Sequence, residues 1–218
     1  MPLFERSALP NIITVGRIVM APLVGLLLFT PTFTARFIAW ILFLIAAFSD
    51  LWDGYLARKH GWISDFGKLV DPIADKLLLV MTFIPFYVLS HRADDPHGSL
   101  VVVGALPLWI VIVIFGRELL ITVIRSVAAR RGLVIPAGKS GKLKAVFQNI
   151  FVGTAIAWLA AHSLALNSGW TEMRNWTYWT YFHGFVFLTS LAIAVFLTVY
   201  SLFVYLVEWR KLMSGTRG

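Results

Sequence analysis

The sequence predicts an all-α integral membrane protein built as a bundle of six transmembrane helices. Hydrophobic residues make up 59% of the 218 residues and charged residues only 14%, whereas about a quarter of a soluble domain is charged. The mean hydropathy is +0.79, and apolar stretches of the length that crosses a bilayer recur along the whole chain. We therefore expect lipid rather than water to surround most of this protein.

Six apolar stretches are long enough to cross the membrane. They lie near residues 12–30, 35–57, 72–90, 100–129, 145–163 and 181–208. Short segments typical of loops separate them, at Pro31, His91–Gly98, Gly132–Gly141 and Asn167–Asn175. No composition shift or repeat divides the chain, so we expect one membrane-embedded domain over residues 1–218.

The placement of Lys and Arg predicts the orientation. Six spans put both termini on one side, where 12 basic residues gather: Arg6, Arg58, Lys59, Lys68, Arg130, Arg131, Lys139, Lys142, Lys144, Arg210, Lys211 and Arg217. The other side has three, Arg36, Arg92 and Arg174. Cytoplasmic loops carry the excess of positive charge, so we expect cytoplasmic termini. Because residues 1–10 contain Glu5 and lack a basic n-region, we expect no signal peptide.

Net charge and cysteine content narrow the classes of partner. The formal charge of +8 suits anionic lipid headgroups or anionic substrates. We expect no nucleic-acid partner, because such an apolar chain has no soluble basic face to offer. The chain has no cysteine, which excludes disulfides and thiolate metal sites.

Four aspartates stand where membrane helices usually carry none. Asp50 and Asp53 close the second span, and Asp71 and Asp75 open the third. Spacings of i,i+3 and i,i+4 place each pair on one helix face, and the short connection makes the two helices antiparallel neighbours. Four carboxylates meeting at the cytoplasmic end would repel one another unless a cation lay between them. Oxygen ligands select a hard divalent ion, Mg²⁺ with Mn²⁺ or Ca²⁺ as competitors.

Helix capping is the alternative explanation. Asp71 could be an N-cap, with Pro72 at the first helical position. The same explanation fails for Asp50 and Asp53, because negative charge at a helix C-terminus opposes the macrodipole. Gly54 and Ala57 could serve close helix packing, or could let a flat nucleotide approach the backbone while Arg58 faces its phosphate.

These residues together resemble the signature of the CDP-alcohol phosphotransferase family, whose positions are filled here by Asp50, Asp53, Gly54, Ala57, Arg58, Gly67, Asp71 and Asp75. The resemblance implies a six-helix membrane enzyme, usually a homodimer, that moves a substituted phosphate from a CDP-alcohol to a second alcohol and releases CMP. It implies that Asp50, Asp53 and Asp71 hold the metal, and that Asp75 is the base with an additional metal contact. Donor binding by Asp50, Gly54, Ala57, Arg58 and Gly67 is implied in the same way.

Basic residues further along the chain point to an anionic acceptor. Arg117 and Arg125 lie eight residues apart on the fourth span, and Lys142 precedes the fifth with Lys139 and Lys144. An arginine as deep as Arg117 is costly unless it meets an anion or Glu118. Topology alone could explain the loop lysines. Two guanidinium forks and a lysine suit the dianion of a phosphate monoester.

Three flanking pieces resemble the members of the family whose acceptor is sn-glycerol 3-phosphate: Pro10–Arg17, the run Gly116–Glu118 with Arg125, and Gly138–Lys144. That resemblance implies that Arg117, Arg125 and Lys142 bind the acceptor phosphate, and that the donor CDP-diacylglycerol is also held by Asn11, Thr14 and Arg17. The predicted products are phosphatidylglycerol phosphate and CMP, made at the cytoplasmic face of a bacterial inner membrane.

Two kinds of alternative remain open. The same chemistry could use inositol phosphate, serine or phosphatidylglycerol as acceptor, and inositol phosphate would also satisfy the three cations. A transporter or channel is the alternative of a different class. It would spread polar residues through the membrane midplane, whereas the carboxylates here gather near one interface.

Overall fold

The computed structural model describes residues 9–60, 65–92, 100, 104–130 and 139–215; the side chains of residues 9–10, 50–60, 65–66, 68–69, 139–140 and 213–215 lie outside this description. The described chain is almost entirely helical, which confirms the predicted all-α class. Its helices are α1 (Leu9–Leu28), α2 (Phe33–His60), α3 (Asp65–Ser90), α4 (Leu108–Arg130), α5 (Lys139–Ser168) and α6 (Arg174–Gly215), with a short 3-10 helix, η3 (Trp170–Glu172), before α6.

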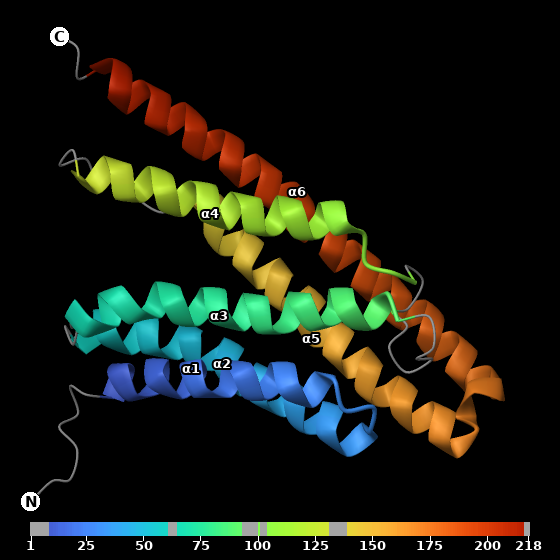
Figure 1. Cartoon of the computed structure of the whole chain (residues 1–218). Helices are drawn as coiled ribbons and strands as arrows, with labels where there is room; N and C mark the ends of the chain where they lie inside the picture. The colour runs from blue at the N-terminus through green and yellow to red at the C-terminus, as the bar shows by residue number, and fades with distance from the viewer. Residues whose placement is uncertain (1–8, 61–64, 93–99, 101–103, 131–138, 216–218) are drawn as a thin grey trace, which may run out of the picture.

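Successive helices run back and forth between two ends of the molecule, with α5 and α6 slanted relative to α1–α4, so that α1 begins and α6 ends at the same end (Figure 1). We call this the basic end, because α4 and α6 end and α5 begins on this side (Figure 1), and these helix ends carry the described basic residues Arg130, Lys142, Arg210 and Lys211. The other is called the opposite end. Helix α1 packs against α2 and α3, α5 packs against α2 and α6, and α4 lies on α6.

Four of the helices contain a segment long and apolar enough to cross a membrane: Asn11–Leu28, Val70–Ser90, Gly141–Ser168 and Arg174–Leu212. Large apolar side chains such as Leu26, Phe185 and Phe203 are exposed on their outer faces, as expected of surfaces that meet lipid. The chain is therefore an integral membrane protein. The other two helices are not among these four. Helix α2 has a shorter apolar stretch over Phe33–Ser49 within its described part, and the apolar sequence of α4 is interrupted by the charged residues Arg117, Glu118 and Arg125.

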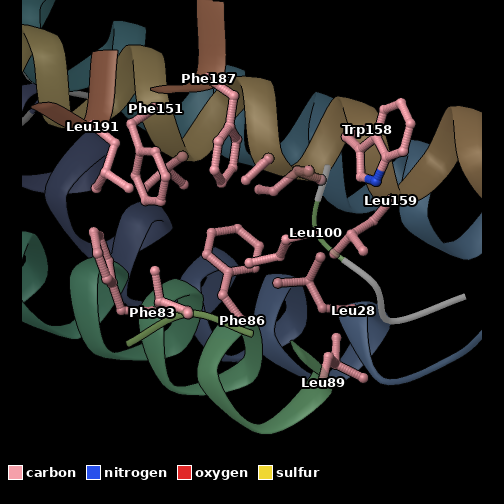
Figure 2. Packing of buried hydrophobic residues seen from close by; sticks show 14 of the residues in the cluster. Leu28, Phe83, Phe86, Leu89, Leu100, Phe151, Trp158, Leu159, Phe187 and Leu191 are labelled. Atoms are coloured by element: carbon pink, nitrogen blue, oxygen red, sulfur yellow. The ribbon is translucent and has the colours of Figure 1, made fainter. Parts of the chain in front are cut away.

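Aromatic side chains from three helices form the centre of the bundle. Figure 2 shows Phe83 and Phe86 of α3 facing Phe151 of α5 and Phe187 of α6. The ring centroids of Phe83 and Phe151 lie 5.4 Å apart, and those of Phe151 and Phe187 lie 4.9 Å apart. All four side chains are fully buried. Such contacts combine apolar burial with favourable ring geometry, so they fix α3 against α5 and α6.

Two glycines let helices approach closely. A Cβ atom added to Gly25 of α1 would lie 3.0 Å from the backbone oxygen of Met81 in α3, and one added to Gly153 of α5 would lie 3.4 Å from the ring of Phe43 in α2. The indole N–H of Trp40 donates to the Gly153 carbonyl at 3.0 Å. Small residues permit this close packing in membranes. It brings the polar residues of α1 and α3 into contact near the basic end.

A buried arginine ties the helices together at the opposite end. Arg36 of α2 donates from Nη1 to the hydroxyl of Ser163 at 2.7 Å and to the carbonyl of Leu159 at 3.4 Å, both on α5. Its Nε donates to the carbonyl of Leu28, at the end of α1, at 3.4 Å. Its side chain is completely buried. Because the C-terminal end of a helix carries partial negative charge, Arg36 is suited to this position.

The expected bounds of the second and third helices were wrong where they bear on the aspartates. Helix α3 begins at Asp65, not near residue 72, so Asp71 lies inside the helix and is not its N-cap. Pro72 interrupts one backbone hydrogen bond without ending the helix, as neighbouring helices allow in membrane bundles. Helix α2 continues to His60, so Asp50 and Asp53 stand within it rather than at its last turn.

The fourth and fifth helices also differ from expectation. Helix α4 starts at Leu108 instead of residue 100, because Gly104 adopts a left-handed conformation with φ of 65° and Pro107 disfavours helix at the residue before it. Leu100 and Leu106 are nevertheless buried, so their apolar character serves the core. Helix α5 starts at Lys139 rather than 145, which puts Lys142 and Lys144 on a helix and not in a loop. Helix α3 ends at Ser90 as expected, and the remaining ends of α1, α2 and α4 differ from the expected positions by one to three residues. Helix α5 ends at Ser168 rather than 163, and α6 extends over Arg174–Gly215 rather than 181–208.

Candidate active site

Two aspartates of α3 meet an arginine and a threonine of α1 near the basic end. The Arg17 guanidinium donates from Nη1 to Asp75 Oδ1 at 2.7 Å and from Nη2 to Asp71 Oδ1 at 3.4 Å. The Thr14 hydroxyl donates to the same Asp71 oxygen at 2.6 Å. Thr14 and Arg17 share one face of α1 and the aspartates share one face of α3, as spacings of three and four residues require. The packing of α1 on α3 joins the two faces.

Burial differs sharply within this group. The Arg17 side chain is 2% exposed, while those of Asp71 and Asp75 are 46% and 54% exposed. The guanidinium therefore lies beneath the carboxylates and holds them by charge-assisted hydrogen bonds. Its charge also reduces the repulsion between the two carboxylates. Asp71 and Asp75 are thus fixed in position and still accessible from the basic end.

A second polar cluster joins α4 to α5. Glu118 accepts from Arg117 Nη1 at 2.9 Å and from Lys144 Nζ. Lys76 of α3 donates to the Thr122 hydroxyl at 2.7 Å, and Thr122 donates in turn to the Glu118 carbonyl at 2.7 Å. The cluster sets three cations against one carboxylate, so it suits an incoming anion.

A cavity of about 150 Å³ lies between the two groups. Its polar lining comes from four helices, and its apolar wall comes from α2, α3 and α5. The polar lining residues are Arg17, Asp75, Lys76, Glu118, Lys144, Gln148 and Asn149, with Thr82 deeper in the bundle. One half-exposed carboxylate thus faces a space bounded by several cations, which is a suitable place for proton removal beside a phosphate.

An apolar groove adjoins this cavity. It has a volume of about 490 Å³ and runs between α2, α5 and α6. Phe43, Ala47 and Asn149 line both the groove and the cavity. A molecule with a polar head and an apolar tail could therefore occupy both at once.

The predicted donor-binding residues are only partly described. The side chains of Asp50, Asp53, Gly54, Ala57 and Arg58 lie outside the described ones, although their backbone belongs to α2. Gly67 is half-buried in the first turn of α3, and Asn11 is half-buried in the first turn of α1. Thr14 and Arg17 contact the aspartates. The donor-binding role of all these residues remains a prediction.

The predicted acceptor residues are spread over a wider region. Arg117 contacts Glu118, Arg125 is exposed with its guanidinium 5.7 Å from the ring centroid of Tyr205 in α6, and Lys142 is exposed on α5. Among the described residues, Lys144 rather than these three lines the cavity. Their binding of the acceptor phosphate stays a prediction.

The sequence assigned no role to Lys76 or Gln148, and it suggested Glu118 only as a partner of Arg117 and Lys144 only as one of the basic residues before the fifth span. The signal was present: Lys144 and Gln148 are four residues apart, and so are Glu118 and Thr122. This spacing indicates a shared face only if residues 139–148 are helical, because side chains four residues apart in a loop need not point the same way.

The described side chains place two carboxylates together and hold no group of three or more metal-ligating residues. Asp50 and Asp53, the other two predicted ligands, are not among them. Asp71 and Asp75 offer accessible oxygen donors in a fixed arrangement, which is the ligand chemistry that Mg²⁺ or Mn²⁺ prefers. The donor set therefore fits the predicted ion.

Comparison with known proteins assigns the family. Residues 7–200 match the family model described as CDP-alcohol phosphatidyltransferase. The chain belongs to this family. The CDP-alcohol phosphatidyltransferase match covers α1 to α5 and most of α6, including every predicted site residue.

Individual proteins are also similar to the chain over about two thirds or more of its length. The chain is 40% identical over 148 residues to a protein of Mycobacterium tuberculosis named "Probable phosphatidylglycerophosphate synthase", covering 66% of this chain and 64% of the relative. It is 35% identical over 168 residues to the CDP-diacylglycerol–glycerol-3-phosphate 3-phosphatidyltransferase of Bacillus subtilis, covering 72% and 78%. A protein of that name from Rickettsia typhi is 30% identical over 184 residues, covering 76% and 95%. The chain thus spans somewhat less than two thirds of the M. tuberculosis relative.

Proposed function

We propose that this protein transfers the phosphatidyl group of CDP-diacylglycerol to sn-glycerol 3-phosphate, giving phosphatidylglycerol phosphate and CMP. The observation that carries the proposal is the position of Asp75, a half-exposed carboxylate held by Arg17 at 2.7 Å and facing a cavity lined by Lys76 and Lys144. The names of the relatives favour glycerol 3-phosphate among the acceptors considered.

The donor is an amphiphile, and the two adjoining spaces match its two parts. Its acyl chains would stay in lipid along the groove between α2, α5 and α6. Its pyrophosphate would lie at the aspartates, and its nucleotide near the following residues: Asn11, Thr14, Arg17, Asp50, Gly54, Ala57, Arg58 and Gly67. The shared wall of Phe43, Ala47 and Asn149 lies where head and tail would meet.

A divalent cation, Mg²⁺ or Mn²⁺, is part of the proposal. Asp50, Asp53, Asp71 and Asp75 would hold it. When bound, such an ion polarises the transferring phosphoryl group and balances the charge of the leaving group. Asp71 and Asp75 are held in place by Thr14 and Arg17, which limits the reorganisation needed on binding.

The side chains supply orientation and proton transfer. Asp75 accepts the proton of the acceptor hydroxyl, whose oxygen forms a bond to the lipid-side phosphorus as the bond from that phosphorus to the CMP oxygen breaks. Arg17 orients the Asp75 carboxylate throughout. Arg117, Arg125 and Lys142 attract the acceptor phosphate, and Lys144 extends the positive lining into the cavity. Positioning and charge stabilisation contribute most of the acceleration in such transfers.

The proposed topology has six spans, cytoplasmic termini and an active site at the cytoplasmic face of a bacterial inner membrane. The gathering of Arg130, Lys142, Arg210 and Lys211 at the basic end supports this orientation under the positive-inside rule. Homodimer formation is proposed from the resemblance to the family. The described helices α4 and α6 expose apolar side chains, such as Ile112 and Phe196, that a second copy or lipid would cover.

The function is tested by measuring CMP release from CDP-diacylglycerol by the purified protein, with Mg²⁺ and one acceptor at a time: glycerol 3-phosphate, inositol phosphate, serine or phosphatidylglycerol. We expect the fastest release with glycerol 3-phosphate and loss of release on chelation. Faster release with inositol phosphate would overturn the acceptor assignment. Unchanged release after chelation would overturn the metal assignment.

A further inference from the structure

Gln148 of α5 is a buried polar residue for which the described fold provides no hydrogen-bond acceptor. Its side chain is 5% exposed, and among the described residues its Nε2 has no partner. Leaving such a donor unpaired costs about 1–3 kcal/mol, and native proteins rarely do so. Gln148 also lines the cavity that contains Asp75. The amide is therefore placed to receive its partner from a molecule bound there.

The neighbouring residues limit what that partner can be. Lys144 lies one helical turn before Gln148 and is bonded to Glu118, so its ammonium group already has a carboxylate partner. Val152, one turn beyond, is apolar. An anionic phosphate would be drawn to the cations of this cluster. A neutral amide is a better partner for a neutral hydroxyl oxygen than for a phosphate, because no charge then has to be removed from water to make the hydrogen bond.

We propose that the Gln148 amide donates a hydrogen bond to the hydroxyl of the acceptor that does not react, and so selects acceptors that carry two hydroxyl groups. The inference rests on the proposed function and deepens it. In glycerol 3-phosphate, the hydroxyl on carbon 1 gives its proton to Asp75 and attacks phosphorus, while the hydroxyl on carbon 2 accepts from Gln148. Gln148 thereby orients the reacting carbon without taking part in bond making.

The test combines one variant with one acceptor analogue. Propane-1,3-diol monophosphate lacks only the hydroxyl on carbon 2. We expect the wild-type protein to favour glycerol 3-phosphate over this analogue by about ten- to hundredfold in kcat/KM, the range expected when a buried donor is left unpaired. In Gln148→Met the preference should fall to about threefold or less, with the KM for CDP-diacylglycerol unchanged.

A stability measurement separates recognition from packing. Methionine is similar in size to glutamine and has no donor to bury, so the Tm of ligand-free Gln148→Met should equal or exceed that of the wild type. A lower Tm with equal loss of activity toward both acceptors would show a packing role and overturn the proposal. A raised KM for CDP-diacylglycerol with the acceptor preference intact would place Gln148 at the donor, and would also overturn it.

Val152→Met is the matched control, because it changes the volume of the same wall one turn away. It should alter turnover of both acceptors by the same factor and preserve the preference; loss of the preference in this variant would mean that cavity shape, and not the amide, sets it. Failure of the proposed function gives a different result. The wild-type protein would then release no CMP with either acceptor.

Discussion

The basic and opposite ends of the bundle each contain a buried arginine, and the two have very different partners. Arg17 contacts two carboxylates that remain about half exposed and lines a cavity. Arg36 contacts two backbone carbonyls and the Ser163 hydroxyl, all within a fully packed region. At one end the charge organises groups that can still bind something else. At the other it completes the packing of α1, α2 and α5.

The difference teaches that burial of a charged residue in a membrane helix is a weak sign of function by itself. Intramembrane ionisable residues are often functional. Arg36 is such a residue, yet it lines neither the cavity nor the apolar groove described above. The informative features are accessible partners and a bordering cavity. Variants that remove one arginine, or one of its partners, can therefore separate activity from stability.

The largest effect is expected for Asp75→Asn at the basic end. The amide cannot accept the acceptor proton, so kcat should fall by about 10²–10⁴-fold, the contribution of a positioned base. Donor binding should be partly retained, since Asp71 is untouched. CMP release and binding of CDP-diacylglycerol measure the two quantities. Turnover close to that of the wild type would remove Asp75 from its role as base.

The next effect contrasts Arg17→Met with Arg36→Met, which remove the two buried guanidinium groups with similar loss of volume. Arg17→Met should lower kcat by about ten- to hundredfold, because Asp75 loses a charge-assisted hydrogen bond of about 1.5–3 kcal/mol. Its Tm should change little, since water can reach the half-exposed carboxylates. Arg36→Met should keep kcat within about twofold and reduce stability by about 1–3 kcal/mol, because buried carbonyls lose their donor.

Thermal unfolding and CMP release on the same purified samples give both numbers for each variant. A loss of about 1 kcal/mol corresponds to a Tm shift of about 2–4 °C in a chain of this size. The contrast fails if both variants lose activity in proportion to their loss of stability. Arg17 would then be one more structural residue.

The smallest effect concerns two glycines of α1. Gly25→Ala should destabilise the protein by about 1 kcal/mol, at the lower end of the cost of overpacking, since the new Cβ would lie 3.0 Å from the Met81 backbone oxygen. Gly16→Ala, whose Cβ meets no described atom within 4 Å, should be neutral or stabilising by up to about 1 kcal/mol from helix propensity alone. Equal Tm changes for the two variants would show that α1 is not tightly packed at Gly25.

Hydropathy was enough to predict the helices, because a bilayer requires long apolar stretches whatever the details of packing. It could not place the start of α4, since Leu100 and Leu106 are as apolar as a membrane helix but are buried by a turn that depends on Gly104 and Pro107. Nor could it place the start of α3, because Pro72 resembles a helix start and the packing that tolerates it comes from distant residues.

For a similar reason, only some of the contacts within the site could be predicted from the sequence. Helical spacing placed Asp71 and Asp75 on one face, and the structure has them together on Arg17. The contact between Glu118 and Lys144 joins two helices far apart in sequence, so no local spacing reveals it. Lys142 and Lys144 are both lysines, two positions apart, so the sequence alone does not show which of them faces the cavity. Because α5 begins at Lys139, both lysines lie on this helix and point in different directions, and Lys144 is buried while Lys142 is exposed.

The phenylalanine cluster has a consequence for the route by which ions could reach the cavity. Phe83 follows Thr82 on α3 and Phe151 lies two residues after Asn149 on α5, so both rings lie just beyond polar residues that line the cavity, on the side of the opposite end, and Phe86 packs beside them. Buried, closely packed apolar rings oppose the passage of charged groups, because they offer nothing to replace the hydration of the charge. An ion that enters the cavity from the basic end would therefore have to leave by the same route.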